Sequence, residues 1–296
     1  MNTHHLSTIQ SNNTTNLTLY NKNMFLKCTN ITSGHYIKNK NIGLGNMLFQ
    51  IASALSYSIK NEANLNIIEF QQFLDIENIN IKNHILRNIT TNFNYNLYKN
   101  VTNIVTNDNY QKYIFDYKFY DNICLNNHFE NYNNFEEIKD LIITYFSPTQ
   151  NDIDYILNKY PFIYDDDICS LHIRMGPDYY NIFGKNSDHI KNLENKYIKC
   201  IEHMINKNIK KIMVFTNDKE YSMSLLSDPK YNEIKFYFSD EKEYIDIWII
   251  SLIKNNIVSV STLSWWGSYL NKRCDKYIIC CKGNIDFLHY PGWIVL

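Results

Sequence analysis

Just past its midpoint the chain reads Ile168-Cys169-Ser170-Leu171-His172-Ile173-Arg174-Met175-Gly176. This short, mostly apolar run ends at a basic residue and a glycine, which is typical of a buried β-strand followed by a turn. His172 and Arg174 are two residues apart, so the period of a strand places both on one face. Because ligands of parallel α/β sheets bind at the carboxyl ends of the strands, we expect a ligand near Arg174.

The segments after this strand alternate between helix and strand patterns. We expect helices at 190–209, 244–254 and 264–271, and strands at 211–215, 234–238, 256–260 and 277–281. Alternation at this spacing predicts an α/β fold with a parallel, Rossmann-like sheet in the C-terminal half.

The N-terminal half shows a second strand and helix pattern. Residues 25–28 and 36–41 are strand-like, and Gly43-Leu44-Gly45-Asn46 opens a helix because the apolar residues that follow recur at helical spacing. Residues 66–127 carry no readable motif, whereas 135–146 and 153–157 are helical in pattern. We therefore expect three parts, which are a loose polar segment at 1–35, an α/β domain at 36–160 and a ligand-binding Rossmann-like domain at 161–296.

The composition of the 296 residues excludes several classes of protein. A hydrophobic share of 45% supplies a core, and 29 basic against 30 acidic residues leave a net charge of -1, so no global field attracts nucleic acid. We find no signal peptide and no run of about eighteen apolar residues, which predicts a soluble, cytoplasmic protein without a membrane span.

Neither cysteines nor acidic clusters indicate a metal site. The seven cysteines are scattered without a CxxC pair or a metal-ligand spacing, which suits a reducing compartment. The run Asp165-Asp166-Asp167 could bind a metal, but it stands at the amino end of its strand, away from the expected ligand edge. A solvated turn is the favoured interpretation of this run.

Polar residues follow three of the expected strands, and each has a structural alternative. A guanidinium matches phosphate oxygens, so Arg174 favours an anion, although it could simply pair with Asp178. Asn217 and Asp218 offer polar groups after the strand at 211–215. Residues 261–264 can begin a helix whose free N–H groups attract phosphate, or only cap that helix. Trp265 and Trp266 are candidates for core aromatics.

Taken together, five segments resemble the family 11 glycosyltransferases, the α-1,2-fucosyltransferases, in the order that the family has them. Gly43-Leu44-Gly45-Asn46-Met47-Leu48-Phe49-Gln50 is similar to the family's GLGNQ[LM]FQ, and His128-Phe129-Glu130-Asn131-Tyr132-Asn133-Asn134-Phe135 to its YFQSEKYF. His172-Ile173-Arg174-Met175-Gly176 resembles H-[IV]-R-R-G, Phe215-Thr216-Asn217-Asp218 resembles FSDD, and Ser261-Thr262-Leu263-Ser264-Trp265-Trp266-Gly267 resembles SSFSWW[AG].

The resemblance implies a GT-B-like pair of Rossmann-type domains with GDP-fucose in the cleft and a glycan acceptor on the N-terminal side. It implies that Arg174 binds the diphosphate with His172 beside it. The resemblance also implies that no divalent metal is required for catalysis. No cofactor is expected, because GDP-fucose is a co-substrate. The remaining implied donor contacts are Gly43, Gly45, Asn46, Asn217, Asp218, Ser261, Ser264 and Trp265.

Two departures from the family pattern concern the turn after Arg174. The family's second arginine is Met175 here, and Pro177 is inserted before Asp178-Tyr179. A transferase that inverts the sugar linkage needs a base for the acceptor hydroxyl, for which we expect Asp178 first and His172 next. A transferase with another linkage, acceptor or GDP-sugar, a non-catalytic binding protein and a scaffold are the alternatives, and the sequence leaves the oligomeric state open.

Overall fold

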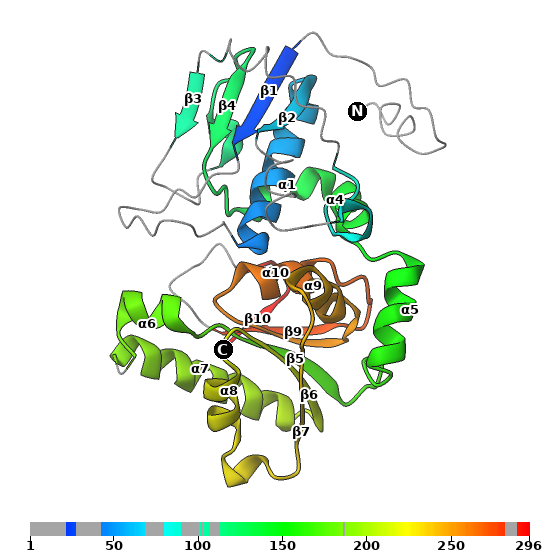
Figure 1. Cartoon of the computed structure of the whole chain (residues 1–296), viewed down its shortest axis with the longest axis vertical. Helices are drawn as coiled ribbons and strands as arrows, with labels where there is room; N and C mark the ends of the chain where they lie inside the picture. The colour runs from blue at the N-terminus through cyan, green and yellow to red at the C-terminus, as the bar shows by residue number, and fades with distance from the viewer. Residues whose placement is uncertain are drawn as a thin grey trace.

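The computed structural model describes residues 22–27, 43–68, 80–89, 101, 103–106, 113–185, 187–281 and 289–296. The strand expected at 36–41 lies outside these ranges. Two stacked α/β halves make up the described chain, and α5 (Gln150–Lys159), which follows the upper half in the chain, lies beside the lower one (Figure 1). The expected boundary at 160–161 falls in the turn after this helix.

The N-terminal sheet is entirely parallel, in the order β2-β1-β4-β3. Its inner strand β1 overlaps the strand expected at 25–28, so the segment 1–35 is not loose throughout. Met24, Phe25 and Leu26 are fully buried, and Met24 and Leu26 belong to the same core as the buried residues of α1. The elements of this half are β1 (Lys22–Lys27), α1 (Leu44–Lys60), β2 (Ala63–Ile68), β3 (Asn103–Thr106), β4 (Ile123–Asn126) and α4 (Lys139–Phe146).

The C-terminal sheet is also parallel, and its strand order is β10-β9-β8-β5-β6-β7. Chain order therefore reverses between β5 and β8, which is the switch point of a doubly wound sheet. The predicted α/β fold with a Rossmann-like sheet is confirmed. Its elements are β5 (Ile168–Ile173), α6 (Pro177–Phe183), α7 (Asp188–Ile205), β6 (Lys211–Thr216), α8 (Lys219–Leu226), β7 (Lys235–Phe238), α9 (Glu243–Leu252), β8 (Asn255–Val258), α10 (Thr262–Tyr269), β9 (Tyr277–Cys280) and β10 (Ile294–Val295).

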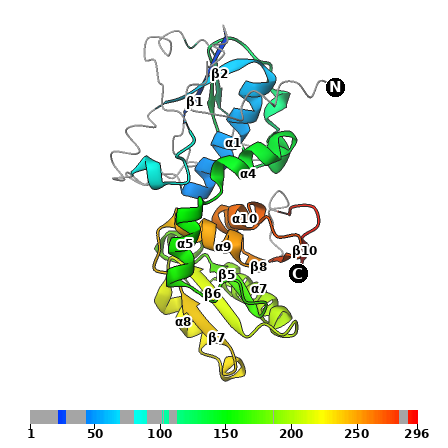
Figure 2. The same ribbon diagram turned by 90° about the vertical axis from the view of Figure 1, so that its right-hand side faces the viewer.

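Helices cover both faces of the C-terminal sheet, because its strands are apolar on both faces. All six residues of β5 are buried, which is why the strand reads as a continuous apolar run. Alternate residues of β5 and β6 pack against α7 on one face, while α9 and α10 cover the other face and continue into the core of the N-terminal half. Both ribbon views place α10 next to the lower end of α1 (Figure 2).

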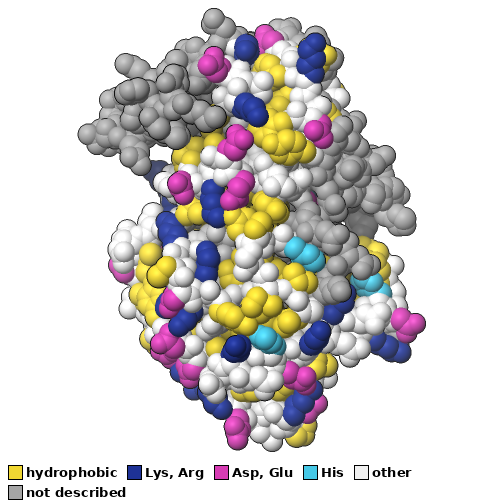
Figure 3. All heavy atoms as spheres, turned by 180° about the vertical axis from the view of Figure 1, so that it is seen from behind, with side chains coloured by type: hydrophobic (Ala, Val, Ile, Leu, Met, Phe, Trp, Pro, Cys, Tyr) yellow, Lys and Arg dark blue, Asp and Glu magenta, His cyan; other side chains and the backbone are white. Residues whose placement is uncertain are grey.

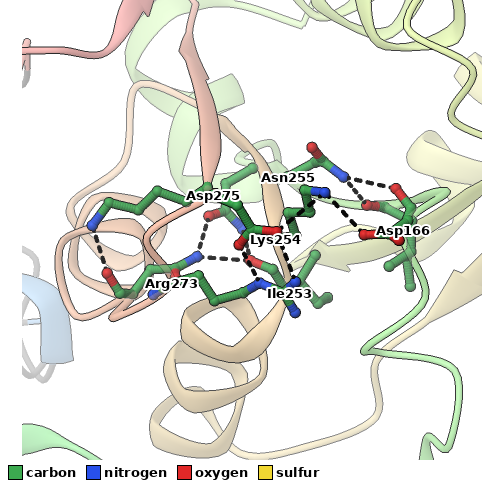
Figure 4. A network of polar contacts seen from close by, with 10 residues as sticks. Asp166, Ile253, Lys254, Asn255, Arg273 and Asp275 are labelled. Atoms are coloured by element: carbon green, nitrogen blue, oxygen red, sulfur yellow. Dashed lines mark hydrogen bonds and ion pairs between the residues drawn. The ribbon is translucent and has the colours of Figure 1, made fainter.

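The amino edge of the C-terminal sheet is closed by ion pairs rather than by a metal site. Lys254 Nζ lies 2.9 Å from Asp166 and 3.2 Å from Asp275, and Arg273 pairs with Asp275 at 3.0 Å (Figure 4). Lys211 pairs with Asp165 and Asp167 at 2.7 and 2.8 Å. The acidic run at 165–167 is thus an ion-paired turn, at the edge opposite Arg174.

The surface has no dominant charge on the face drawn in Figure 3, where basic and acidic side chains are interspersed with apolar ones. This mixture agrees with the net charge of -1. Among the described residues, no helix is long and apolar enough to cross a membrane.

Candidate functional site

The switch point of the C-terminal sheet brings two of the sequence motifs together. Arg174 follows β5 directly, and residues 259–264 follow β8, its neighbour in the sheet. Residues 217–218 follow β6, which pairs with β5 on the other side. Three motifs separated by up to 90 residues of chain therefore meet at one edge of the sheet.

Arg174 is held by aromatic residues. Its backbone N–H donates to the hydroxyl of Tyr197 on α7 at 3.1 Å, and its guanidinium carbon lies 5.6 Å from the centre of the Tyr179 ring. Such an arrangement places the cation beside an aromatic face. The side chain is partly buried.

The backbone geometry of the turn after Arg174 accounts for a glycine at position 176 and a proline at position 177. Gly176 has φ 145° and precedes α6, in which Pro177 is the first residue. The positive φ favours glycine, and proline is well suited to the first turn of a helix. The inserted proline thus begins a short helix that sets Tyr179 beside Arg174. Asp178 belongs to this helix, but its side chain lies outside what the structure describes. Met175 is fully buried in the core.

His172 is buried one strand residue before the end of β5. Its Nδ1 lies 3.2 Å from the hydroxyl oxygen of Ser259, which follows β8. Burial, and then the positive charge of Arg174, lower the pKa of His172 from 6.5 to about 3. The imidazole is therefore neutral near pH 7 and is a weak base, which counts against the role of general base that we considered for it.

Asn217 and Asp218 shape the loops at the end of β6. The side-chain oxygen of Asn217 accepts the backbone N–H of Met175 at 3.1 Å. One carboxylate oxygen of Asp218 caps α8 by accepting the N–H of Tyr221 at 3.0 Å, and the other accepts the hydroxyl of Tyr180 at 3.2 Å. Both side chains thus hold the turn after β5 against the turn after β6.

Serines organise the start of α10. The hydroxyl oxygen of Ser261 accepts the N–H of Leu263 at 3.3 Å and so caps the helix. The Ser264 hydroxyl donates to the carbonyl of Ser261 at 3.1 Å and its oxygen accepts the N–H of Ser259 at 3.2 Å. Trp265 is fully buried, with its ring stacked 4.7 Å from that of Tyr269. It is a core aromatic in this structure rather than a side chain exposed to a nucleotide.

The helix-opening glycines lie at the N-terminus of α1, which meets the N-terminus of α10. A Cβ on Gly45 would lie 2.5 Å from the Thr262 hydroxyl oxygen and 2.7 Å from the backbone nitrogen of Leu263. The carbonyl of Gly45 accepts the indole N–H of Trp266 at 2.9 Å. Gly43 has an ordinary φ of -59°, and nothing lies within 4 Å of a Cβ placed there. Only the second glycine is required by close packing.

Asn46 joins the two halves through a chain of polar contacts. Its side-chain oxygen accepts the Thr262 hydroxyl at 2.6 Å, and its nitrogen lies 3.1 Å from Nδ1 of His128. The same Nδ1 lies 3.1 Å from a carboxylate oxygen of Glu130. The chain therefore runs from α10 through α1 to the segment that follows β4.

Several residues at this edge were not singled out from the sequence. Thr262 lies within a motif, and Ser259 and Tyr180 lie close to one in the sequence, so that position could have indicated them. Nothing in the sequence indicates Tyr197, because an aromatic residue in an amphipathic helix is expected in the core. His128 and Glu130 were quoted only within a motif of the resemblance, without a role.

A metal ion has no evident place in the described part of the chain. No group of three or more His, Cys, Asp or Glu side chains gathers there with the spacing of a metal site. The polar groups that do converge are a guanidinium, a neutral imidazole, hydroxyls, amides and the carboxylate of Asp218, which Tyr180 and the N-terminus of α8 hold. This set suits an oxygen-rich anionic ligand.

Known proteins resemble this chain in sequence and in fold. It is 26% identical over 302 residues to the O-antigen biosynthesis glycosyltransferase WbnK of Escherichia coli, an alignment that spans 86% of this chain and 98% of that protein. No protein-family model matches the chain.

Solved fucosyltransferases are among the similar structures. A mutant of FUT1 from Arabidopsis thaliana in complex with GDP matches with 12% identity and a TM-score of 0.46, over 84% of this chain and 69% of that one. NodZ from Bradyrhizobium matches with 12% identity and a TM-score of 0.46, over 83% of this chain and 92% of that one. POFUT1 in complex with GDP-fucose matches over about half of each chain, 51% and 49%, with 9% identity and a TM-score of 0.34.

Proposed function

We propose that the protein is a glycosyltransferase that moves L-fucose from GDP-β-L-fucose to a glycan hydroxyl, forming an α-1,2 linkage to a terminal galactose. The glycosyltransferase class is supported by the relative from Escherichia coli, whose alignment covers most of both chains. The donor and the linkage are supported by the five sequence motifs that resemble the α-1,2-fucosyltransferases.

The observation that carries the proposal is the position of these motifs at the switch point. Open α/β sheets bind ligands in the crevice outside the carboxyl ends of the strands where the strand order reverses. Arg174 and the start of α10 flank that point here, one after β5 and the other after β8. A basic side chain and a helix N-terminus on the two sides of the switch point suit a diphosphate.

Two groups would stabilise the charge that develops on the departing GDP. The guanidinium of Arg174 offers paired N–H donors that fit phosphate oxygens. The N-terminus of α10 adds a positive partial charge and free N–H groups near Ser261. The first N–H of α1 donates to Glu243 at 3.4 Å, so that helix already has an anionic partner.

The reaction follows from the donor's geometry. The acceptor oxygen attacks the anomeric carbon, the bond from that carbon to the phosphate oxygen breaks, and GDP leaves with the electron pair. A single displacement of this kind converts the β-linked sugar into an α-fucoside. The acceptor hydroxyl must also lose a proton to a base.

Asp178 is our candidate for that base. It lies in α6, four residues after Arg174, whereas His172 is buried and has its pKa lowered to about 3. Asp178→Asn should therefore abolish transfer and leave GDP binding intact. A variant that transfers fucose at the normal rate would assign the base elsewhere.

Calorimetric titration with GDP-fucose tests the donor site. Loss of a charge-assisted contact worth about 1.5–3 kcal/mol should weaken binding by about 10- to 100-fold in Arg174→Ala. Arg273→Ala is the matched control, because Arg273 pairs with Asp275 at the opposite edge of the sheet. Unchanged affinity in Arg174→Ala, or an equal loss in the control, would refute the diphosphate assignment.

A non-catalytic GDP-sugar-binding protein is the second candidate. It is favoured by Met175, which replaces the family's second arginine and is fully buried in the core, so the turn offers one cation in place of two. This alternative predicts that GDP-fucose binds tightly but that no acceptor is fucosylated.

A further inference from the structure

A buried pair of serines connects His172 to the start of α10. Ser259 lies between them, with its hydroxyl oxygen 3.2 Å from Nδ1 of His172 and 3.3 Å from the hydroxyl oxygen of Ser264. All three side chains are buried, and His172 is 6% exposed. The pair spans the switch point, because His172 is on β5 and both serines follow β8.

The proton positions in this chain can be counted. The Ser264 hydroxyl can donate to the carbonyl of Ser261 at 3.1 Å, and in its 3.3 Å contact with the Ser259 hydroxyl either oxygen can be the donor. When the Ser264 proton lies on the carbonyl, the Ser264 oxygen acts toward Ser259 only as an acceptor. Ser259 has one hydroxyl proton, which it can give either to Ser264 or to Nδ1 of His172. The first choice requires the imidazole proton on Nδ1, and the second requires it on Nε2.

Charge decides between the two arrangements when an anion is bound. Arg174 is two residues from His172 and draws a phosphate to the same strand end. A neutral imidazole beside that phosphate is favourable if Nε2 carries a proton to donate, and unfavourable if Nε2 presents a lone pair. Burial keeps a second proton off the ring, so the tautomer alone sets what His172 offers.

We propose that Ser259 and Ser264 are positioning residues that hold His172 as the neutral tautomer with its proton on Nε2, so that it donates a hydrogen bond to the nucleotide diphosphate. The Ser264 oxygen accepts the backbone N–H of Ser259 and so fixes the position of Ser259. The Ser259 hydroxyl then donates to Nδ1 of His172. His172 then acts as a hydrogen-bond donor to the leaving group and not as a base. The identity of the anion rests on the proposed function, and the choice of tautomer rests on an anion being bound beside Arg174.

Nuclear magnetic resonance of ¹⁵N-histidine-labelled protein tests the tautomer directly, with and without GDP. The His172 signals are assigned by their loss in His172→Gln. We expect Nδ1 to show the shift of an unprotonated nitrogen and Nε2 that of a protonated one in the GDP complex. A proton on Nδ1 in that complex would overturn the proposal.

Variants test whether the serines set the tautomer. Ser259→Ala should leave a mixture of tautomers, and Ser259→Thr, which keeps the hydroxyl, should restore the wild-type signals. Ser251→Ala is the matched control, because Ser251 is equally buried but donates to the carbonyl of Trp248. If Ser259→Ala does not fold, Ser259→Cys, whose thiol is a much weaker donor, should show the same mixture. A wild-type tautomer in folded Ser259→Ala or Ser259→Cys would contradict the proposal.

Transfer kinetics separate this inference from the proposed function. Ser259→Ala should lower kcat by about tenfold, the effect of one hydrogen bond, with the KM for the acceptor unchanged. Absence of fucose transfer by the wild type, together with the expected tautomer, would refute only the proposed function. Normal kcat in Ser259→Ala would refute only the inference.

Discussion

The contact between the N-termini of α1 and α10 gives a sharp test through Gly45→Ala. The added Cβ would lie 2.5–2.7 Å from Thr262 and from the backbone nitrogen of Leu263. Backbone atoms at that distance cannot be accommodated by rotating a side chain, so the two helices must move apart. Such a movement separates the two halves of the molecule at the candidate site.

The expected cost can be estimated from these contacts. Overpacking costs about 1–3 kcal/mol, and replacing a helical glycine by alanine returns about 0.5–1 kcal/mol, so the net loss is about 0–2.5 kcal/mol and lies toward the upper end because the clash is with backbone atoms. If the helices move far enough to break the bond from Trp266 to the Gly45 carbonyl, a buried indole N–H left unpaired adds about 1–3 kcal/mol. Thermal unfolding should show a Tm lowered by about 2–8 °C.

Gly43→Ala is the matched control for this experiment. Nothing lies within 4 Å of a Cβ at Gly43, and its φ of -59° suits any residue, so Gly43→Ala should lower the free energy of unfolding only by the loss of a favourable N-cap residue, about 0.5–1 kcal/mol. Urea denaturation of both variants measures the difference. A midpoint for Gly45→Ala at or above that of Gly43→Ala would refute the close packing.

Two further predictions concern pH and helix capping. Burial raises the pKa of Asp246 from 3.8 to about 7, so the folded state favours the protonated form and stability falls by about 1.4 kcal/mol per pH unit between about pH 4 and pH 7. Other groups, among them His172 with its lowered pKa, contribute slopes of the opposite sign, so the test is the difference between wild type and Asp246→Asn. The free energy of unfolding of wild type minus that of Asp246→Asn, from urea denaturation across this range, should fall with that slope; a difference that does not change with pH would contradict it. Ser261→Ala should cost about 1 kcal/mol and weaken GDP binding, whereas Thr149→Ala, which removes the cap of α5, should cost as much stability without changing GDP affinity. Equal GDP affinity in both variants would separate α10 from the ligand.

The C-terminal sheet could be predicted from the sequence because its signals are local. The run at 168–173 is apolar because both faces of β5 are buried, and the helix at 188–205 repeats apolar residues at helical spacing. The ends of these strands follow directly, and with them the position of Arg174. The helix α6 was missed because Pro177 stands at its first position, where a proline reads as a break.

Contacts between distant parts of the chain could not be predicted in this way. Asn46 and Thr262 are 216 residues apart, and nothing local indicates that their side chains meet. The same holds for the two glycines at the start of α1, where only the neighbouring helix distinguishes Gly45 from Gly43. Trp265 was named both as a ligand contact and as a core residue, and its position in the core shows which of these the packing selected.

The central claim is fucose transfer, and product analysis tests it most directly. Purified protein would be incubated with GDP-fucose and a panel of galactose-terminated acceptors, in EDTA and without added metal, and the products examined by mass spectrometry and linkage analysis. We predict a fucosylated product with an α-1,2 linkage to galactose and release of GDP. Absence of any fucosylated product across the panel, with GDP-fucose recovered intact, would contradict the claim.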